Sequence, residues 1–151
     1  MNQSTDDLDR RVRRLVYDVT LRRGTPPTLA ATADGLDTSP QQIAASFQRL
    51  AAGRVFVLAP DSGEILMANP FSAVPTPFLV EFEDYACYGN CIWDAMGTVA
   101  MRGRDARIKT SCGDCGAPME VRIVSQALQS SRGVAHYALP ARRWWDDIVF
   151  N

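Results

Sequence analysis

The sequence predicts an α+β protein in which a winged-helix-like three-helix domain, residues 1–69, precedes a mixed or antiparallel sheet core with a central helix, residues 70–151. Two observations lead to this fold class. Apolar residues recur at helical spacing along most of the first fifty residues, which predicts amphipathic helices. Beyond them, short runs of alternating apolar and polar residues between prolines and glycines predict strands joined by turns.

Two helices are expected in the first forty residues. The first ends before Gly24, where its apolar pattern stops. Its buried stripe consists of Leu8, Val12, Leu15, Val16 and Val19. Thr25 followed by Pro26 is typical of an N-cap and first helical turn, so a short second helix is expected from there to Ala33.

A third helix and a hairpin complete this half. Ser39, with a proline after it and a glutamine at the capping-box position, predicts a helix that ends at Gly53. Residues 54–70 then read as strand, turn and strand. A winged helix of this kind can bind DNA, but the expected recognition helix offers little positive charge for phosphates. Its polar candidates are Gln41, Gln42, Gln48 and Arg49. Nucleic-acid binding is therefore not expected.

The second half predicts strands around one helix. Asn90 is a favourable N-cap, which predicts a helix from Cys91 to about Met101. A short closing helix is expected over ARRWWDDIVF, residues 141–150. The expected strands are 78–82, 106–110, 119–124 and 135–139.

Composition excludes several classes of protein. The 151 residues are 46% hydrophobic and 22% charged, which is typical of a globular domain, and the net charge is −1, so no overall field attracts nucleic acid or an anionic membrane. Residues 1–14 have no apolar h-region, and no stretch approaches the roughly 20 apolar residues of a spanning helix. A cytoplasmic protein is expected. In a reducing compartment, cysteines are expected to act as ligands or reactive thiols. The four are Cys87, Cys91, Cys112 and Cys115.

The segment NCIWDAMG, residues 90–97, carries the most suggestive pairing. With Asn90 as cap, Cys91 stands at the first helical position, where free backbone N–H groups and the helix dipole are expected to stabilise a thiolate. Asp94 follows at i+3 on the same face. A thiolate can hold a soft metal while the carboxyl group moves a proton. Alternatively, Cys91 is buried packing and Asp94 only supports the start of its helix.

Several blocks in the second half resemble the organomercurial (alkylmercury) lyase family. They are NPFSAVPTPFLV, YGNCIWDAMG, RDARIKTSCGDCGAP and VAHYALPARRWWDDI, and they occur in the family's order. The family also has an N-terminal winged-helix-like domain, which corresponds here to residues 8–69. The resemblance thus implies an alkylmercury lyase-like fold over most of the chain.

The resemblance also implies a reaction, the protonolysis of a carbon–mercury bond to a hydrocarbon and Hg(II). Cys91 matches the family's first catalytic cysteine, Asp94 its catalytic aspartate, and Cys112 a further cysteine regarded as structural. Mercury is then substrate and product, so no other cofactor is implied. The implied partners are a small organomercurial or other soft-metal substrate and small thiols.

One departure from the family pattern concerns its second catalytic cysteine. The corresponding segment reads SSRGVAHYAL; His136 matches a family histidine, which puts Arg132 or a neighbour at the cysteine position, and no cysteine follows Cys115. Either Cys87, Cys115 or a small-molecule thiol completes the ligand set, or the activity is lost or changed in this chain.

The cysteines support a rival interpretation. C-x3-C at Cys87 and Cys91, with C-x2-C at Cys112 and Cys115, predicts a tetrahedral structural zinc site, which would make the protein a non-enzymatic zinc or soft-metal module, regulatory through its winged-helix half. Without zinc, Cys112 and Cys115 can form a relay that receives Hg(II) from Cys91. A diverged relative with other small-molecule chemistry is a third alternative.

The remaining aromatic and histidine residues are expected to be structural. Trp93 is expected in the core beneath the central helix, and His136 in a strand. Trp144 and Trp145 are expected on the docking face of the closing helix. Trp93 forming an apolar wall around an organic group is the functional alternative.

Overall fold

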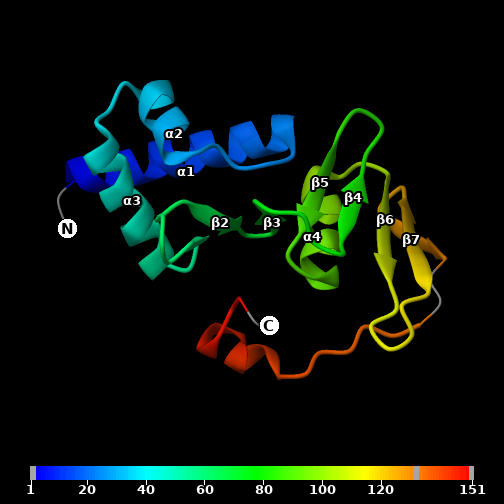
Figure 1. The fold of residues 1–151 in the computed structure, drawn as a ribbon. Coiled ribbons are helices and arrows are strands. Elements are labelled where there is room, and N and C mark those ends of the chain that lie inside the picture. Colours follow the sequence, from blue (N-terminus) through cyan, green and yellow to red (C-terminus); the bar gives the residue numbers. More distant parts are fainter. Residues whose placement is uncertain (1–2, 131–132, 150–151) are drawn as a thin grey trace.

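Three helices form the first third of the chain in the computed structural model, which describes residues 3–130 and 133–149 (Figure 1). They are α1 (Gln3–Arg23), α2 (Leu29–Leu36) and α3 (Pro40–Ala52). Ser39 caps α3 by accepting from the backbone N–H of Gln42, as predicted. A hairpin of β1 (Phe56–Leu58) and β2 (Ile65–Ala68) follows, so the predicted order of three helices and a hairpin is confirmed.

The predicted bounds of the second helix are wrong. Thr28, not Thr25, is its N-cap, and the Thr28 hydroxyl accepts from the N–H of Ala31 at 3.1 Å. Two consecutive prolines, Pro26 and Pro27, precede it. A residue before proline is pushed out of the helical conformation, so α2 starts only after both. It continues past Ala33 to Leu36.

The strands of the described residues belong to one eight-stranded sheet in the order β1-β2-β3-β5-β4-β6-β7-β8. Every pair of neighbouring strands is antiparallel. Of the two predicted kinds of sheet, mixed or antiparallel, the structure therefore has the antiparallel one. The strands after the hairpin are β3 (Phe71–Ser72), β4 (Leu79–Glu81), β5 (Ala86–Gly89), β6 (Ala106–Ser111), β7 (Pro118–Val124) and β8 (Ala127–Ser130). Because β2 pairs with β3, the sheet continues across the predicted boundary between residues 69 and 70, and the division into two domains stays a prediction.

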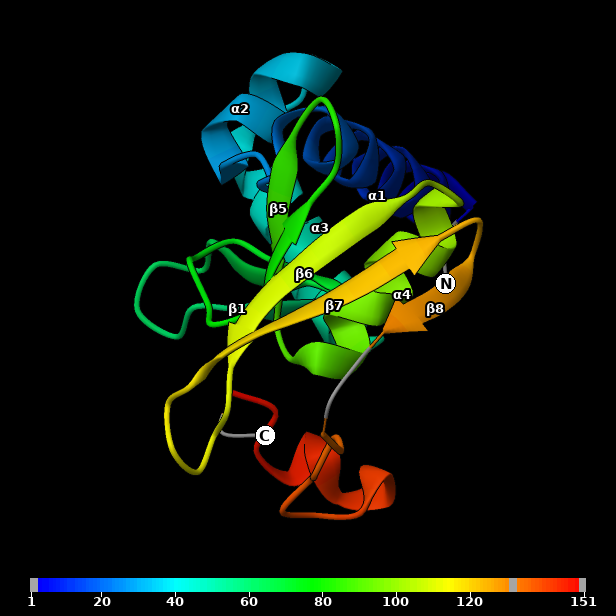
Figure 2. The same cartoon turned by 90° about the vertical axis from the view of Figure 1, so that its right-hand side faces the viewer.

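Two hydrophobic cores lie along this sheet. The first joins the three helices to the hairpin, around Phe47 and Phe56. The second lies between the sheet and the central helix, α4 (Ile92–Arg102), around Phe71 and Val99. Tyr17 of α1 packs against both cores, so the end of α1 joins the two halves. Figure 2 shows β6 and β7 running across α4.

The predicted strand 135–139 is wrong. Residues 133–140 form no helix or strand, and the last strand in the described part of the chain is β8, which pairs with β7. Ser125 and Gln126 turn the chain between them with φ of 50° and 60°. Positive φ at both central residues is typical of a tight hairpin turn, but glycine or asparagine usually provides it, so the turn was missed. The closing helix is a 3-10 helix, η1 (Ala141–Asp146).

Two glycines permit close contacts between elements. A Cβ at Gly89, the last residue of β5, would lie 2.6 Å from the backbone nitrogen of Ala95 in α4. Gly24, with φ of 82°, follows α1, and a Cβ there would clash with the carbonyl oxygen of Ala86 in β5. These contacts place the start of α4 directly against β5 and the end of α1 against the same strand.

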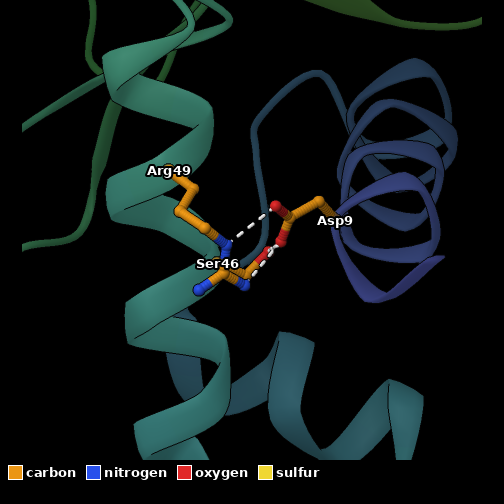
Figure 3. A network of polar contacts seen from close by, with 3 residues as sticks. All are labelled: Asp9, Ser46 and Arg49. Carbon is orange, nitrogen blue, oxygen red and sulfur yellow. Dashed lines mark hydrogen bonds and ion pairs between the residues drawn. The ribbon is translucent and has the colours of Figure 1, made fainter. Parts of the chain in front are cut away.

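A polar network joins α1 to α3 (Figure 3). Asp9 accepts from Ser46 Oγ at 2.6 Å, and from Arg49 Nε and Nη2 at 2.8 and 2.7 Å. The Arg49 guanidinium holds the pKa of the Asp9 carboxyl below its usual value. Arg49 is the arginine of the expected recognition helix, and here it stabilises helix packing.

Among the described residues, no helix combines the length and the apolar character needed to cross a membrane.

Candidate functional site

A pocket of about 190 Å³ lies where the start of α4 meets the end of β2 and the C-terminal segment. Cys91 and Asp94 both line it, so the structure brings the two predicted catalytic residues into one cavity. The other lining residues are Met67, Asn69, Asn90, Trp93, Tyr137, Trp144, Trp145, Ile148 and Val149. The surroundings of the Cys91–Asp94 pair are therefore mostly apolar and aromatic.

The predicted cap of α4 is off by one residue. Cys91, not Asn90, is the N-cap, with extended backbone, and α4 starts at Ile92. The Asn90 side chain is engaged elsewhere, because its amide nitrogen donates to Asp94 Oδ2 at 3.0 Å and to Asn69 Oδ1 at 3.2 Å. Asn90 therefore orients the Asp94 carboxyl group rather than the helix terminus.

The half-buried Asp94 side chain lies three residues after the cap and contacts Cys91. Burial raises the pKa of the Asp94 carboxyl, while hydrogen bonds from Asn90 and from the Cys91 thiol counteract part of that shift. A carboxyl group whose pKa is raised holds a proton more readily than an exposed one. Asp94 thus has the environment of a proton carrier.

The prediction that Cys91 rests as a stabilised thiolate is wrong. Burial raises the pKa of its thiol, and the negative charge of Asp94 raises it further. The N–H groups of Asp94 and Trp93 lower the pKa, as the helix-terminus argument predicted, but they do not outweigh burial. Cys91 is therefore held as a thiol beside a carboxyl group that can accept its proton.

Aromatic side chains form much of the pocket wall. Trp93 is 60% exposed, so its predicted place in the core is wrong. It lines the pocket together with Trp144 and Trp145 of η1. Tyr137 also contributes, with its ring centroid 5.2 Å from that of Trp144. Sequence reasoning missed Tyr137 and Asn69, since each reaches the pocket from a segment far from α4 in the chain.

The other predicted ligands lie outside this pocket. Cys87 is buried in β5, and burial raises the pKa of its thiol to about 11. Cys112 and Cys115 occupy the turn between β6 and β7. Within residues 3–130 and 133–149, no group of three or more His, Cys, Asp or Glu side chains is placed to hold a metal ion. The structure therefore does not gather the four cysteines into one site, and zinc binding stays a prediction.

Two further predicted positions are not part of the pocket. His136 is exposed and does not line the cavity, and it lies in no strand. Arg132, the residue matched to the second family cysteine, lies outside the described residues, so that correspondence stays a prediction.

Comparison with known proteins agrees with the fold described above. The family model for alkylmercury lyase (MerB) matches residues 71–150, which include strands β3 to β8, α4 and η1 but not the β1–β2 hairpin. Among solved structures, the mercury-bound form of MerB2 is similar with a TM-score of 0.62 at 17% sequence identity. The match covers 80% of this chain and 59% of that one, so this chain spans less than two thirds of its solved relative. No curated protein matches the sequence. Because the family model covers more than half of its length, the chain belongs to the alkylmercury lyase family.

Proposed function

We propose that this protein cleaves the carbon–mercury bond of organomercurial compounds by protonolysis, with Cys91 as the mercury ligand and Asp94 as the proton donor. The observation that carries the proposal is the contact between the Cys91 thiol and the half-buried Asp94 carboxyl inside an apolar pocket. Membership of the alkylmercury lyase family and similarity to a mercury-bound relative support the same chemistry.

The first step is binding of the substrate cation, RHg⁺, by Cys91. The sulfur–mercury bond forms as the S–H bond breaks, and the thiol proton passes to the adjacent Asp94 carboxylate. The raised pKa values of both groups suit this transfer, because the thiol keeps its proton until mercury displaces it and the buried carboxyl group then retains it. Asn90 holds Asp94 in place through its 3.0 Å hydrogen bond.

The second step transfers that proton to carbon. The carbon atom keeps the electron pair of the carbon–mercury bond and takes the proton from Asp94, which releases the hydrocarbon RH. Mercury stays on the Cys91 sulfur as Hg(II), and Asp94 returns to the carboxylate form. Charge and atoms balance, since the proton given to carbon is the one that the Cys91 thiol lost.

A second sulfur on mercury would weaken its bond to carbon, and a small-molecule thiol is its expected source. Among the described lining residues, Cys91 supplies the thiol of the pocket. Cys87 is 1% exposed and lies outside it, and no cysteine follows Cys115 in the sequence. An added thiol would also remove Hg(II) after cleavage.

The pocket wall favours an apolar organic group. Rings of Trp93, Tyr137, Trp144 and Trp145 surround the space next to Cys91, and burial of a hydrocarbon against them is favourable. Aryl and alkyl groups are therefore expected to be accepted in preference to charged ones.

The test is release of benzene from phenylmercuric acetate by reduced, metal-free protein with excess small thiol. We expect turnover by the wild type and none by Cys91→Ser. Asp94→Asn keeps the shape of the side chain but lacks the acidic proton, so turnover is expected to fall by about 10²- to 10⁴-fold while phenylmercury still binds. Asp84→Asn, which alters an exposed carboxylate paired with Arg104, is the matched control and is expected to retain full turnover.

Each outcome has a definite meaning. Benzene release that survives in Asp94→Asn would contradict Asp94 as proton donor. No benzene from folded wild type with titratable thiols would overturn the lyase proposal and favour a diverged relative with other chemistry.

A further inference from the structure

A pair of thiols, Cys112 and Cys115, lies on the hairpin turn between β6 and β7, outside the pocket. Ser111 and Pro118 form the last register pair of the two strands, and the turn CGDCGA, residues 112–117, closes the hairpin. The Cys112 N–H donates to Ala117 O at 2.8 Å, and the Gly116 N–H donates to Cys112 O at 2.9 Å. Gly116 has φ of 71°, a conformation that glycine adopts without strain. The turn is thus tightly fixed by its own backbone.

The turn brings its two sulfur atoms together. The thiol of Cys115 and the backbone N–H groups of Cys115 and Asp114 all donate toward the Cys112 sulfur. Both cysteines are free, and Cys115 is exposed while Cys112 is partly exposed. An ion in solvent can therefore reach both sulfurs without any opening of the core.

The rest of the chain does not complete a closed metal site around this pair. In the part of the chain that the structure describes, no third His, Cys, Asp or Glu is positioned with it as a ligand group. Structural zinc sites need four protein ligands in a tetrahedron, which this turn does not provide. Hg²⁺ is strongly thiophilic and is satisfied by two thiolates, so a turn with two sulfurs suits it.

We propose that Cys112 and Cys115 form a separate two-thiolate site for a thiophilic divalent cation, with Hg²⁺ as its preferred occupant. Each thiol loses its proton as its sulfur–metal bond forms, so two protons are released for each ion bound and no electron transfer occurs. The site is distinct from the pocket, whose lining includes neither cysteine. It does not depend on the proposed lyase activity, although Hg²⁺ released by that activity would be one source of the ion.

The test measures Hg²⁺ binding in Cys91→Ser protein, which lacks the pocket thiol and the proposed activity. Reduced, metal-free protein is titrated with Hg²⁺ in the presence of a small competing monothiol, and native mass spectrometry counts the ions bound per chain. We expect one Hg²⁺ per chain, with release of two protons. Removal of the second thiol in Cys91→Ser/Cys115→Ser is expected to weaken binding by about a hundredfold or more, since two linked ligands act at high effective concentration.

Controls separate the site from other effects. Cys115 is exposed, so its serine variant is expected to fold, and circular dichroism checks this. Cys91→Ser/Ser111→Ala changes an exposed neighbour of the turn and is expected to bind Hg²⁺ as tightly as Cys91→Ser. The buried Cys87 is present in all three proteins, so any contribution from it cancels.

Three results would overturn the proposal. The first is equal Hg²⁺ affinity with and without Cys115. The second is one ion held between two chains, which the mass of the complex reveals. The third is Zn²⁺ binding as tight as that of Hg²⁺, which would require ligands beyond the two thiols. Because the test uses a protein without the pocket thiol, these results are independent of whether the lyase proposal holds.

Discussion

The two cysteine motifs of this chain have similar backbone surroundings and opposite properties. In the α4 pocket, Cys91 is followed three residues later by Asp94, and on the hairpin turn Cys112 is followed three residues later by Cys115. In both motifs, the backbone N–H groups of the residues two and three positions later donate toward the sulfur of the first cysteine. Yet the pKa of the Cys91 thiol is raised by burial, whereas the pKa of Cys112 is lowered by the N–H groups of Cys115 and Asp114.

The difference shows that burial and the residue three positions later decide whether the pKa of the first cysteine in such a motif is raised or lowered. The pocket partly buries Cys91 and places a carboxyl group beside it, and both effects disfavour the thiolate. The hairpin turn leaves Cys112 near solvent and gives it a neutral donor, so the N–H groups dominate. We therefore expect the Cys91 thiol in the pocket to keep its proton and the Cys112 thiol on the turn to lose its proton more readily.

The largest expected difference is in thiol reactivity. A short pulse of iodoacetamide at pH 7, followed by peptide mass spectrometry, is expected to modify Cys112 fastest, Cys91 more slowly and Cys87 least. A thiol with a pKa of about 11 carries roughly a hundredfold less thiolate at pH 7 than an ordinary one, and burial slows Cys87 further. In urea the three rates are expected to converge. Equal rates of modification for Cys91 and Cys112 in folded protein would contradict the expected difference between the two motifs.

A substitution at the close contact between β5 and α4 is expected to have the next largest effect. Gly89→Ala places a methyl group 2.6 Å from the Ala95 nitrogen, so either β5 or α4 must shift, at a cost of about 1–3 kcal/mol in free energy of unfolding. Urea denaturation measures this change.

The matched control is Gly97→Ala in the same helix. A Cβ at Gly97 meets nothing within 4 Å, and alanine favours the helix, so about 0.5–1 kcal/mol of stabilisation is expected. If both substitutions destabilised the protein, the loss of stability in Gly89→Ala could not be attributed to the close contact between Gly89 and Ala95.

The smallest expected effect is a pH dependence of stability. The pKa of Asp94 is raised on folding, so its favourable contribution is present below the unfolded value, near 3.8, and is lost as pH rises through the folded value. Asp94→Asn keeps a neutral side chain at every pH. We therefore expect the variant and wild type to have similar melting temperatures at low pH, with a growing advantage for the variant as pH rises above about 4.

Asp84 is the control for this sign, because the hydrogen bond from Arg104 lowers the pKa of that exposed carboxyl. Its contribution is present above the unfolded value and is lost as pH falls through the folded one, so Asp84→Asn is not expected to gain stability with rising pH. A similar gain in both variants would mean that net charge, not burial of Asp94, governs the effect.

Much of the fold could be predicted from local sequence signals. Ser39 with its following proline and glutamine marked the start of α3, and the apolar spacing of α1 predicted a helix that ends before Gly24. The start of α2 was missed because Thr25 and Thr28 offer the same hydroxyl, and only one of them follows both prolines. The strand at 135–139 was wrong because alternation alone does not say whether a sheet edge is still free.

The candidate site could be predicted only in part. Cys91 and Asp94 stand one helical turn apart, so their proximity followed from the spacing. The aromatic wall did not, since Tyr137, Trp144 and Trp145 come from a segment with no strand and only a short 3-10 helix. Nothing in their local pattern indicates that they pack over α4.

The sequence by itself predicted that Cys91 and Asp94 lie together, because a thiol and a carboxyl group three residues apart at the start of a helix share a face. It also determined the order of helices and hairpin through caps, prolines and apolar spacing. Only the tertiary structure decided the protonation of Cys91, the separation of the four cysteines into a pocket, a core and a turn, and the aromatic cover. The physical reason is that pKa values and metal geometry depend on burial and on neighbours brought together from distant parts of the chain.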